Sequence, residues 1–205
     1  MPQQNYKLQI RLLSDALIGA SEGFGAIIDK DSVFDQVGLP VIPGKRVKGI
    51  LREQAEFLAK FGQIKPDIDM LFGFIGMTDK SQEYLSVGNF VLENYKDNFE
   101  CLKCLISKGS ITRSEVINHF TTLRMMTRIE DGIAADTSLR TIRVLKKGLL
   151  FTGDLIFDTS QLEIFNDVSS LTRRIGSMRN RGLGHIQCTL QDITSTIEHS
   201  KSVAI

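Results

Sequence analysis

The chain has 205 residues, of which 42% are hydrophobic and 24% are charged, as in an ordinary globular domain. No apolar run approaches the length of about 18 residues that a membrane span needs, and three cysteines do not suit a disulfide framework, so we expect a cytoplasmic protein. The net charge of +1 does not by itself indicate nucleic-acid binding.

The first half of the chain predicts one strand and one long helix. Residues 6–13 alternate between apolar and polar side chains, which is typical of a half-buried strand. Residues 19–38 are irregular and rich in Gly and Asp, and we interpret them as a long, lid-like functional loop. From Val47 to Phe61 apolar residues recur every three or four positions, which predicts a helix that buries them and ends at Gly62.

The second half predicts shorter elements and a fold class. We expect a strand at 84–92, a helix at 98–107 and a second helix at 112–122, which begins with a capping box formed by Thr112 and Glu115. A hairpin at 140–158 that turns at Lys147-Gly148, a helix at 160–174 and a strand at 185–193 should follow. This order indicates an α+β fold with a ferredoxin-like (RRM-like) βαββαβ core and an antiparallel sheet. A single domain should span 1–205, with an inserted middle segment at 94–138 and a loose tail at 199–205.

A glycine-rich turn at residues 175–184 is the first candidate site. Closely spaced glycines let backbone N–H groups converge on an anion, and Arg179 and Arg181 add positive charge. The spacing fits neither common nucleotide-binding fingerprint, so a phosphodiester backbone suits the turn better than a nucleotide. The alternative is an ordinary helix-to-strand turn with solvated arginines.

Basic residues also crowd the start of the predicted helix. A helix dipole disfavours cations there, so these residues suggest a bound anion, with a solvated basic face as the alternative. Gly49 lies among them, where another backbone could approach closely. Three basic clusters would form one face if the fold brings them together: Lys45, Arg46, Lys48 and Arg52; Arg140, Arg143, Lys146 and Lys147; Arg173, Arg174, Arg179 and Arg181.

Three acids lie in the 19–38 loop, namely Asp29, Asp31 and Asp35. Clustered carboxylates can hold Mg²⁺ or act as a general base on an RNA 2′-hydroxyl, although loop aspartates commonly serve only as turn formers.

The cysteines and histidines give weaker signals. Cys101 and Cys104 form half a zinc site, but we favour a helical pair with one buried thiol. The three histidines do not suggest a catalytic triad. His185 is the one of interest, because it directly follows the glycine-rich turn.

Four motifs, in the same order, resemble the RAMP superfamily of CRISPR-associated proteins. They are the proline–glycine segment 38–52, Leu71-Phe-Gly73, the mid-chain segment 131–148 and the glycine-rich turn 175–184, and together they span roughly residues 8–192. The resemblance implies a ferredoxin-like domain that binds RNA by backbone contacts and stacking. The RNA-binding positions it implies are Lys45, Arg46, Lys48, Arg52, Arg140, Gly176, Arg179, Asn180, Arg181 and His185.

Within that superfamily the chain is most similar to the repeating backbone subunit of type III effector complexes. In that subunit an aspartate ahead of the proline–glycine segment, together with a divalent metal such as Mg²⁺, promotes 2′-hydroxyl attack on target RNA. Residues 25–29 and Asp35 are similar to that context, and Lys30-Asp31 replaces the family's Asn-Pro. The resemblance therefore implies Asp29 or Asp31 as the cleaving residue and Asp29 as a metal ligand.

The resemblance also implies the partners. They are CRISPR RNA, target RNA, other subunits of the complex and further copies of the chain, with no membrane, and the middle segment would supply a thumb-like element. Two alternatives stay open. One is a structural RNA-binding subunit without cleavage, and the other is a metal-independent CRISPR RNA-processing endoribonuclease that uses a histidine, for which His185 is the candidate.

Overall fold

The first strand, β1 (Gln3–Leu12), forms the centre of the fold. The computed structural model describes residues 3–19, 28–62, 68–73, 84–131, 133–136 and 138–192. Along β1 the side chains alternate as expected: Tyr6, Leu8, Ile10 and Leu12 are buried, whereas the residues between them reach solvent. One face of β1 therefore belongs to the core.

An antiparallel sheet forms around β1. The strands β8 (Leu150–Asp158) and β9 (Ile186–Asp192) pair with its two edges, and the short strands β2 (Ser86–Val87) and β3 (Val91–Leu92) both pair with β8. In the strand order β2–β8–β1–β9 the first strand, β1, lies beside the last, β9, which forms one edge of the sheet. The expected ferredoxin-like α+β arrangement is thus confirmed.

Two helices, α1 (Gly44–Lys60) and α5 (Leu162–Leu171), pack against the sheet. Their buried side chains, among them Leu51 and Phe165, share one hydrophobic core with β1. The first turn of α1 lies directly on β2, since a Cβ at Gly44 would be 2.3 Å from the Val87 carbonyl oxygen. The short helix α2 (Ile68–Phe72) and the 3-10 turn η1 (Thr159–Gln161) complete this layer.

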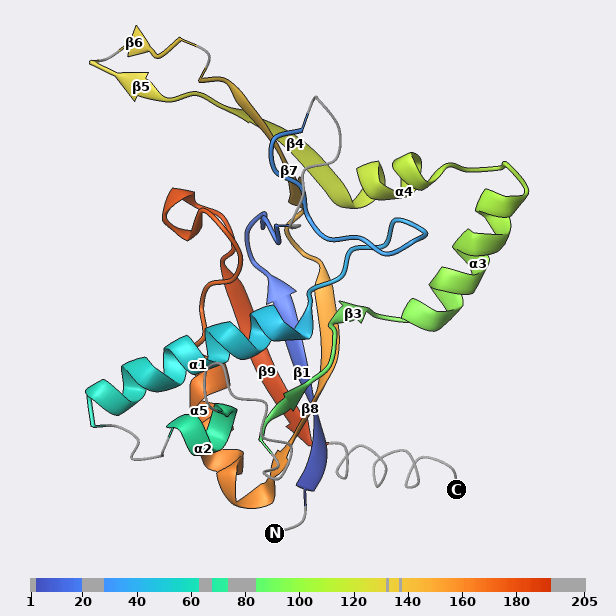
Figure 1. Ribbon diagram of the computed structural model, residues 1–205. Helices are drawn as coiled ribbons and strands as arrows, with labels where there is room; N and C mark the ends of the chain where they lie inside the picture. Colours follow the sequence, from blue (N-terminus) through green and yellow to red (C-terminus); the bar gives the residue numbers. More distant parts are fainter. Residues whose placement is uncertain are drawn as a thin grey trace.

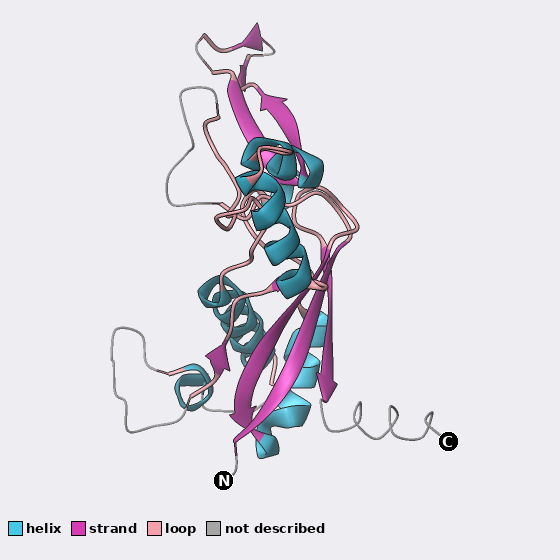
Figure 2. Ribbon diagram, turned by 90° about the vertical axis from the view of Figure 1, so that its right-hand side faces the viewer, coloured by secondary structure: helices cyan, strands magenta, loops and turns pink. Residues whose placement is uncertain are grey.

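An arm projects beyond one end of the sheet (Figures 1 and 2). It consists of β4 (Thr121–Met126) paired with β7 (Arg140–Leu145), followed toward its tip by β5 (Ile129–Glu130) paired with β6 (Ile133–Ala134). The helices α3 (Tyr95–Ser107) and α4 (Arg113–Phe120) lead into it. The predicted capping box is confirmed, because the Thr112 side chain accepts from the Glu115 N–H and the Glu115 carboxylate accepts from the Thr112 N–H.

The predicted hairpin at 140–158 is wrong in its pairing. The strand β7 pairs with β4 in the arm, whereas β8 pairs with β1 in the sheet. The chain changes sheets at the turn before β8, where Gly148 has a φ of 90° and donates its N–H to the Leu12 carbonyl oxygen at 2.7 Å. A short glycine turn between two strands therefore connects two sheets here rather than closing one hairpin.

Two further expectations need correction. The strand at 84–92 is interrupted between β2 and β3, where Phe90 turns inward and its ring lies over Gly153, at which a Cβ would be 2.6 Å from the ring. Phe61 was expected to face the core but is 68% exposed, because it lies in line with the exposed residues 53 and 57 and not with the buried residues of α1. The predicted tail at 199–205 lies outside the described residues. Within the described residues, no helix is both long and apolar enough to span a bilayer.

Candidate functional site

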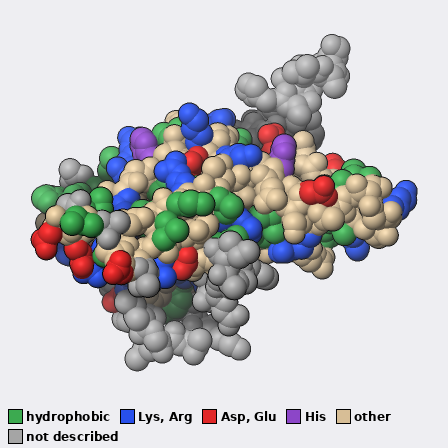
Figure 3. Space-filling view, turned by 90° about the horizontal axis from the view of Figure 1, so that it is seen from above, with side chains coloured by type: hydrophobic (Ala, Val, Ile, Leu, Met, Phe, Trp, Pro, Cys, Tyr) green, Lys and Arg blue, Asp and Glu red, His purple; other side chains and the backbone are tan. Residues whose placement is uncertain are grey.

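Three hollows adjoin one another on the surface and share lining residues. The first, of about 950 Å³, lies against the arm and includes Arg140; the second, of about 920 Å³, lies at the glycine-rich turn; the third, of about 740 Å³, lies between α1 and α5. The first and second share Met178 and Arg181, and the second and third share Glu53, Arg174 and Arg179. We call these three hollows together the groove. Lys and Arg side chains recur across the molecular face seen in Figure 3.

The glycine-rich turn lies beside the middle of α1. The 3-10 turn η2 (Arg179–Arg181) lies within the glycine-rich turn, and the Arg179 guanidinium is 2.9 Å from the Glu53 carboxylate on α1. The RNA-binding hypothesis requires the start of α1 and the glycine-rich turn on one side of the domain. The ion pair brings the turn to the residue that follows Arg52, so the turn and this helix lie on the same side.

The glycine-rich turn is held tightly by the chain that follows β1. Gly176 has a φ of 80°, and a Cβ there would lie 2.3 Å from the Leu17 carbonyl oxygen. Gly184 has a φ of 72°, and a Cβ there would lie 1.9 Å from the Ile175 carbonyl oxygen. These glycines are therefore required by packing, which leaves the exposed Asn180 and Arg181 between them free to meet a ligand.

Of the four predicted basic residues in the first half of α1, one is exposed and three donate hydrogen bonds within the fold. Lys45 is exposed, and Arg46 donates to the Gly19 carbonyl oxygen. Lys48 donates to the Leu85 carbonyl oxygen at 2.9 Å, and burial, followed by the nearby charge of Arg52, lowers the pKa of its ammonium group. Lys48 therefore makes a contact within the fold.

Arg52 is likewise committed to the fold. Its guanidinium donates to the Glu56 carboxylate at 3.0 Å, to the Asp69 carboxylate at 2.5 Å and to the Gly73 carbonyl oxygen at 2.7 Å. Asp69 and Gly73 tie α1 to α2 and to the residue after it, whereas Glu56 lies one turn further along α1 itself. Neither this side chain nor that of Lys45, Arg46 or Lys48 lines the groove.

Asp29 lies beside the arm, where the chain runs along β7. Its N–H donates to the Thr141 carbonyl oxygen at 2.9 Å, and its carboxylate accepts the Thr141 N–H at 2.8 Å and an Arg140 N–H at 3.2 Å. The Asp29 side chain is 34% exposed. Its neighbour Lys30 lines the second hollow and its partner Arg140 lines the first, so this carboxylate lies near their junction.

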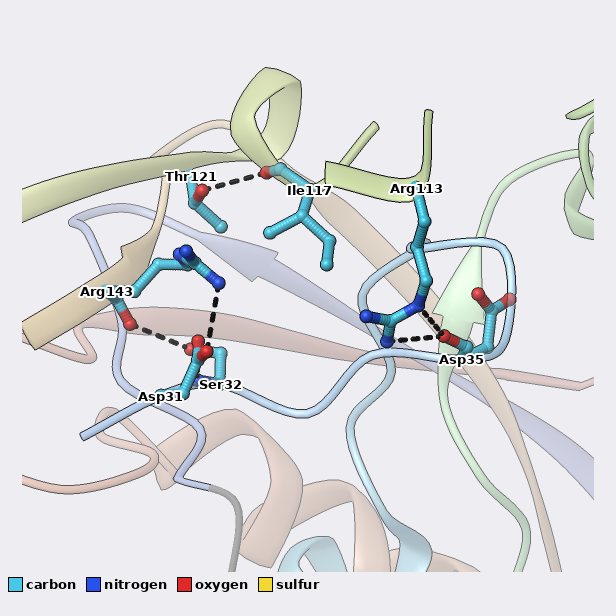
Figure 4. Close-up of polar contacts among 7 residues, drawn as sticks. All are labelled: Asp31, Ser32, Asp35, Arg113, Ile117, Thr121 and Arg143. Carbon is cyan, nitrogen blue, oxygen red and sulfur yellow. Dashed lines mark hydrogen bonds and ion pairs between the residues drawn. The ribbon is translucent and has the colours of Figure 1, made fainter. Parts of the chain in front are cut away.

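Asp31 and Asp35 have structural contacts instead (Figure 4). The Asp31 side chain is only 1% exposed and pairs with Arg143 on β7 at 2.9 Å, and its other oxygen accepts the Ser32 N–H at 2.7 Å. Burial raises the pKa of Asp31 and outweighs the opposite effects of that hydrogen bond and of Arg143.

The Asp35 carboxylate accepts the N–H groups of Val37 and Leu39 at 2.9 and 2.8 Å and the Tyr95 hydroxyl at 3.0 Å. Its carbonyl oxygen accepts an N–H of Arg113 on α4 at 2.9 Å. Of the three loop acids, only Asp29 pairs with an arginine that lines the groove.

A metal site does not follow from the described residues alone. Among them, no group of three or more His, Cys, Asp or Glu residues could hold an ion, and both oxygens of Asp29 already accept hydrogen bonds. A divalent cation prefers several oxygen ligands, so this donor set does not fit a resident Mg²⁺. Asp29 would be its single acidic ligand.

Within the described part of the chain, the cysteines form no zinc site either. Cys101 and Cys104 lie on α3 as expected, but both are exposed, so the expectation that one is buried is wrong. The buried thiol is Cys188, whose pKa burial raises to about 12. Cys101 and Cys104 are exposed because the side of α3 that packs on α4 carries Leu102 and Ile106 instead.

His185 lies outside the groove. It is exposed, and its backbone N–H donates to the Ser14 hydroxyl at 2.9 Å. The prediction from sequence missed Lys30, Arg128 and Met178, all of which line the groove. Lys30 could have been found as the cation between two candidate acids and Met178 as a member of the glycine-rich turn, whereas Arg128 carries no local signal.

Comparisons with known proteins agree with this architecture. The sequence model of the RAMP superfamily matches residues 9–187, most of the chain. No curated protein sequence matches the chain significantly.

Solved structures share the fold at low sequence identity. A chain of the cryo-EM structure of a type III-B Cmr-β complex bound to cognate target RNA superposes with a TM-score of 0.65 at 12% identity, covering 91% of this chain and 96% of that one. The apo state of Cmr-β gives 0.63 at 13% identity, covering 91% and 97%. Oligomeric Cmr4 from Pyrococcus furiosus gives 0.54 at 13% identity, covering 94% and 100%.

Proposed function

This chain belongs to the RAMP superfamily, and we propose that it is a CRISPR RNA-binding backbone subunit of a type III effector complex, present in several copies along the RNA. The observation that carries the proposal is the row of three adjoining open hollows, because a row of phosphates needs a track rather than one closed pocket. The fold shared with oligomeric Cmr4 and with a Cmr-β chain in a complex bound to target RNA supports the same partners.

The groove has the charge that a phosphodiester backbone requires. Its central hollow is lined by Lys30, Arg174, Arg179 and Arg181, with Glu53 as the one acid among the described residues that line it. Arg181 is exposed and lines two hollows at once, so it would lie at the middle of the RNA path. Guanidinium groups bind phosphates through paired N–H donors, which suits them to this position.

The binding test uses the full chain and a fluorescently labelled single-stranded RNA. Arg181→Ala should weaken binding severalfold at low salt, because it removes a charge from the centre of the groove. Lys103→Ala is the matched control, since Lys103 is an exposed cation on α3 outside the groove. On longer RNAs the mass of the complex should rise in steps of one chain. Equal affinities of the two variants would contradict the proposal.

We further propose that Asp29 acts in cleavage of target RNA. Its carboxylate would take the proton from a 2′-hydroxyl, whose oxygen attacks the adjacent phosphorus while the bond to the 5′ oxygen breaks. The departing 5′ oxygen would take up a proton from water. The products would be a 2′,3′-cyclic phosphate and a 5′-hydroxyl. Arg140, now 3.2 Å from the Asp29 carboxylate, would meet the negative charge that develops on the phosphate.

The cleavage test compares Asp29→Asn with Asp97→Asn, which changes an exposed carboxylate on α3. In the assembled complex, Asp29→Asn should abolish the cuts while RNA binding persists, and the control should cut normally. No step above runs through a metal, so parallel reactions in Mg²⁺ and EDTA test the divalent-metal expectation separately. Cleavage that survives Asp29→Asn would favour a structural subunit without this catalytic group. Cleavage lost on changing His185 and unaffected by EDTA would favour a processing endoribonuclease.

A further inference from the structure

One exposed ridge of α1 ends in two aromatic rings. Residues 45, 49, 53, 57 and 61 recur every fourth position and are all exposed, which places them along one line of the helix surface. At the end of this line Phe57 is 54% exposed and Phe61 is 68% exposed. Their ring centroids are 4.7 Å apart, with an angle of 47° between the ring planes. Neither ring contributes to the buried core on the opposite side of α1.

The two rings lie at the end of the groove rather than on an isolated surface. Phe57 lines the third hollow together with Arg173 and Arg174. That hollow continues into the glycine-rich turn through Arg174, Arg179 and Glu53. A chain of phosphates bound along the central hollow would therefore reach the aromatic pair without leaving the groove.

The charges of this hollow favour a polyanion as the occupant. Its lining includes four cations, Lys60, Arg173, Arg174 and Arg179, and two acids, Glu53 and Glu56, which leaves an excess of two positive charges. A ligand that brings both anionic groups and flat apolar groups matches arginines next to exposed phenylalanines. Single-stranded RNA has this composition, because each nucleotide carries a phosphate and a base with a free π-face.

We propose that Phe57 and Phe61 form a stacking platform for an unpaired base of the RNA bound in the groove. The inference rests on the proposed RNA-binding function and deepens it, since it assigns base contact to a part of the site outside the motifs that the sequence singled out. Base stacking on an aromatic ring tolerates any sequence, so the platform would bind a nucleotide without reading its identity. The neighbouring arginines would hold the flanking phosphates.

The experiment compares two single-stranded RNAs of equal length, one normal and one with abasic residues. The double variant Phe57→Leu/Phe61→Leu keeps apolar side chains on the ridge but removes both rings. The single variant Phe57→Trp keeps an aromatic stacking surface at that position. On normal RNA, affinity should fall about 10-fold in the double variant and stay near the wild-type value in Phe57→Trp. On abasic RNA all three proteins should bind equally. A 2-aminopurine base in the RNA should lose fluorescence on the wild type and less on the double variant.

The outcomes separate this inference from the function on which it rests. If the wild type binds both RNAs and the double variant matches it on each, the platform is refuted and RNA binding stands. If the wild type binds neither RNA at low salt, both the proposed function and the stacking platform are refuted. A change in oligomeric state of the double variant, without a base-dependent change in affinity, would assign the ridge to contact between copies and overturn the proposal. Thermal unfolding of each variant confirms that the fold is intact.

Discussion

Replacing Asp31 with Ala should lower the free energy of unfolding by about 3 kcal/mol. The substitution leaves the Arg143 guanidinium without its partner in a place where the Arg143 side chain is only 17% exposed. Breaking a buried ion pair from one side typically costs about 3–5 kcal/mol, and the remaining exposure of Arg143 points to the lower end of that range. The Nε atom of Arg143 already lacks a hydrogen-bond partner, so the guanidinium has little to replace the lost carboxylate.

Urea denaturation of the purified chain measures this cost. For a chain of this size a slope of about 2–3 kcal/mol per molar urea converts the loss into a midpoint lowered by about 1 M. The control is the double variant Asp31→Leu/Arg143→Met, which removes both charges and should unfold within about 1 kcal/mol of the wild type. A loss below about 1 kcal/mol in Asp31→Ala would refute the view that this pair is buried and anchors the Asp29 segment to β7.

Three further predictions test the pKa shifts and the turn geometry. Burial raises the pKa of Asp31 above its ordinary value of 3.8. The contribution of this group to stability is therefore full below pH 3.8 and is lost as the pH rises through the folded-state pKa. The difference in unfolding free energy, wild type minus Asp31→Asn, should fall as the pH increases from 3.8. Gly184→Ala should destabilise the fold by more than about 3 kcal/mol because its Cβ would overlap the Ile175 carbonyl, whereas Gly182→Ala, with φ of 76° and open space, should cost only about 1–2 kcal/mol in thermal unfolding. Iodoacetamide at pH 8 should label the two exposed cysteines of α3 and leave Cys188, with its pKa of about 12, unlabelled until denaturant is added, as mass spectrometry would show.

Local patterns predicted the core of the fold well. The alternation along β1, the apolar stripe of α1 and the capping box of α4 each arise from residues close in sequence, so a single segment carries the whole signal. The prediction that β7 pairs with β8 was wrong because the true partner of β7 is β4, which lies outside residues 140–158. Nothing within residues 140–158 indicates that β7 pairs with β4 rather than with β8.

The candidate site shows the same limit. Asp29 and Asp31 look alike in sequence, and what separates them is an arginine 112 positions away, which buries and pairs Asp31. Likewise, Lys48 and Arg52 read as phosphate ligands until their acceptors, Leu85, Asp69 and Gly73, are brought to them by the fold. Arg181, by contrast, is an exposed predicted residue that lines two of the three hollows.

The salt dependence of RNA binding tests the central claim most directly. The affinity of the wild-type chain for single-stranded RNA, measured from low to high salt, should fall steeply, because each bound phosphate releases counterions. Arg181→Ala should make the slope of log affinity against log salt shallower by about 0.7, the value for one phosphate of a single strand, and Lys103→Ala should leave it unchanged. A shallow wild-type slope, or the same slope in Arg181→Ala, would contradict the assignment of the groove as an RNA phosphate track.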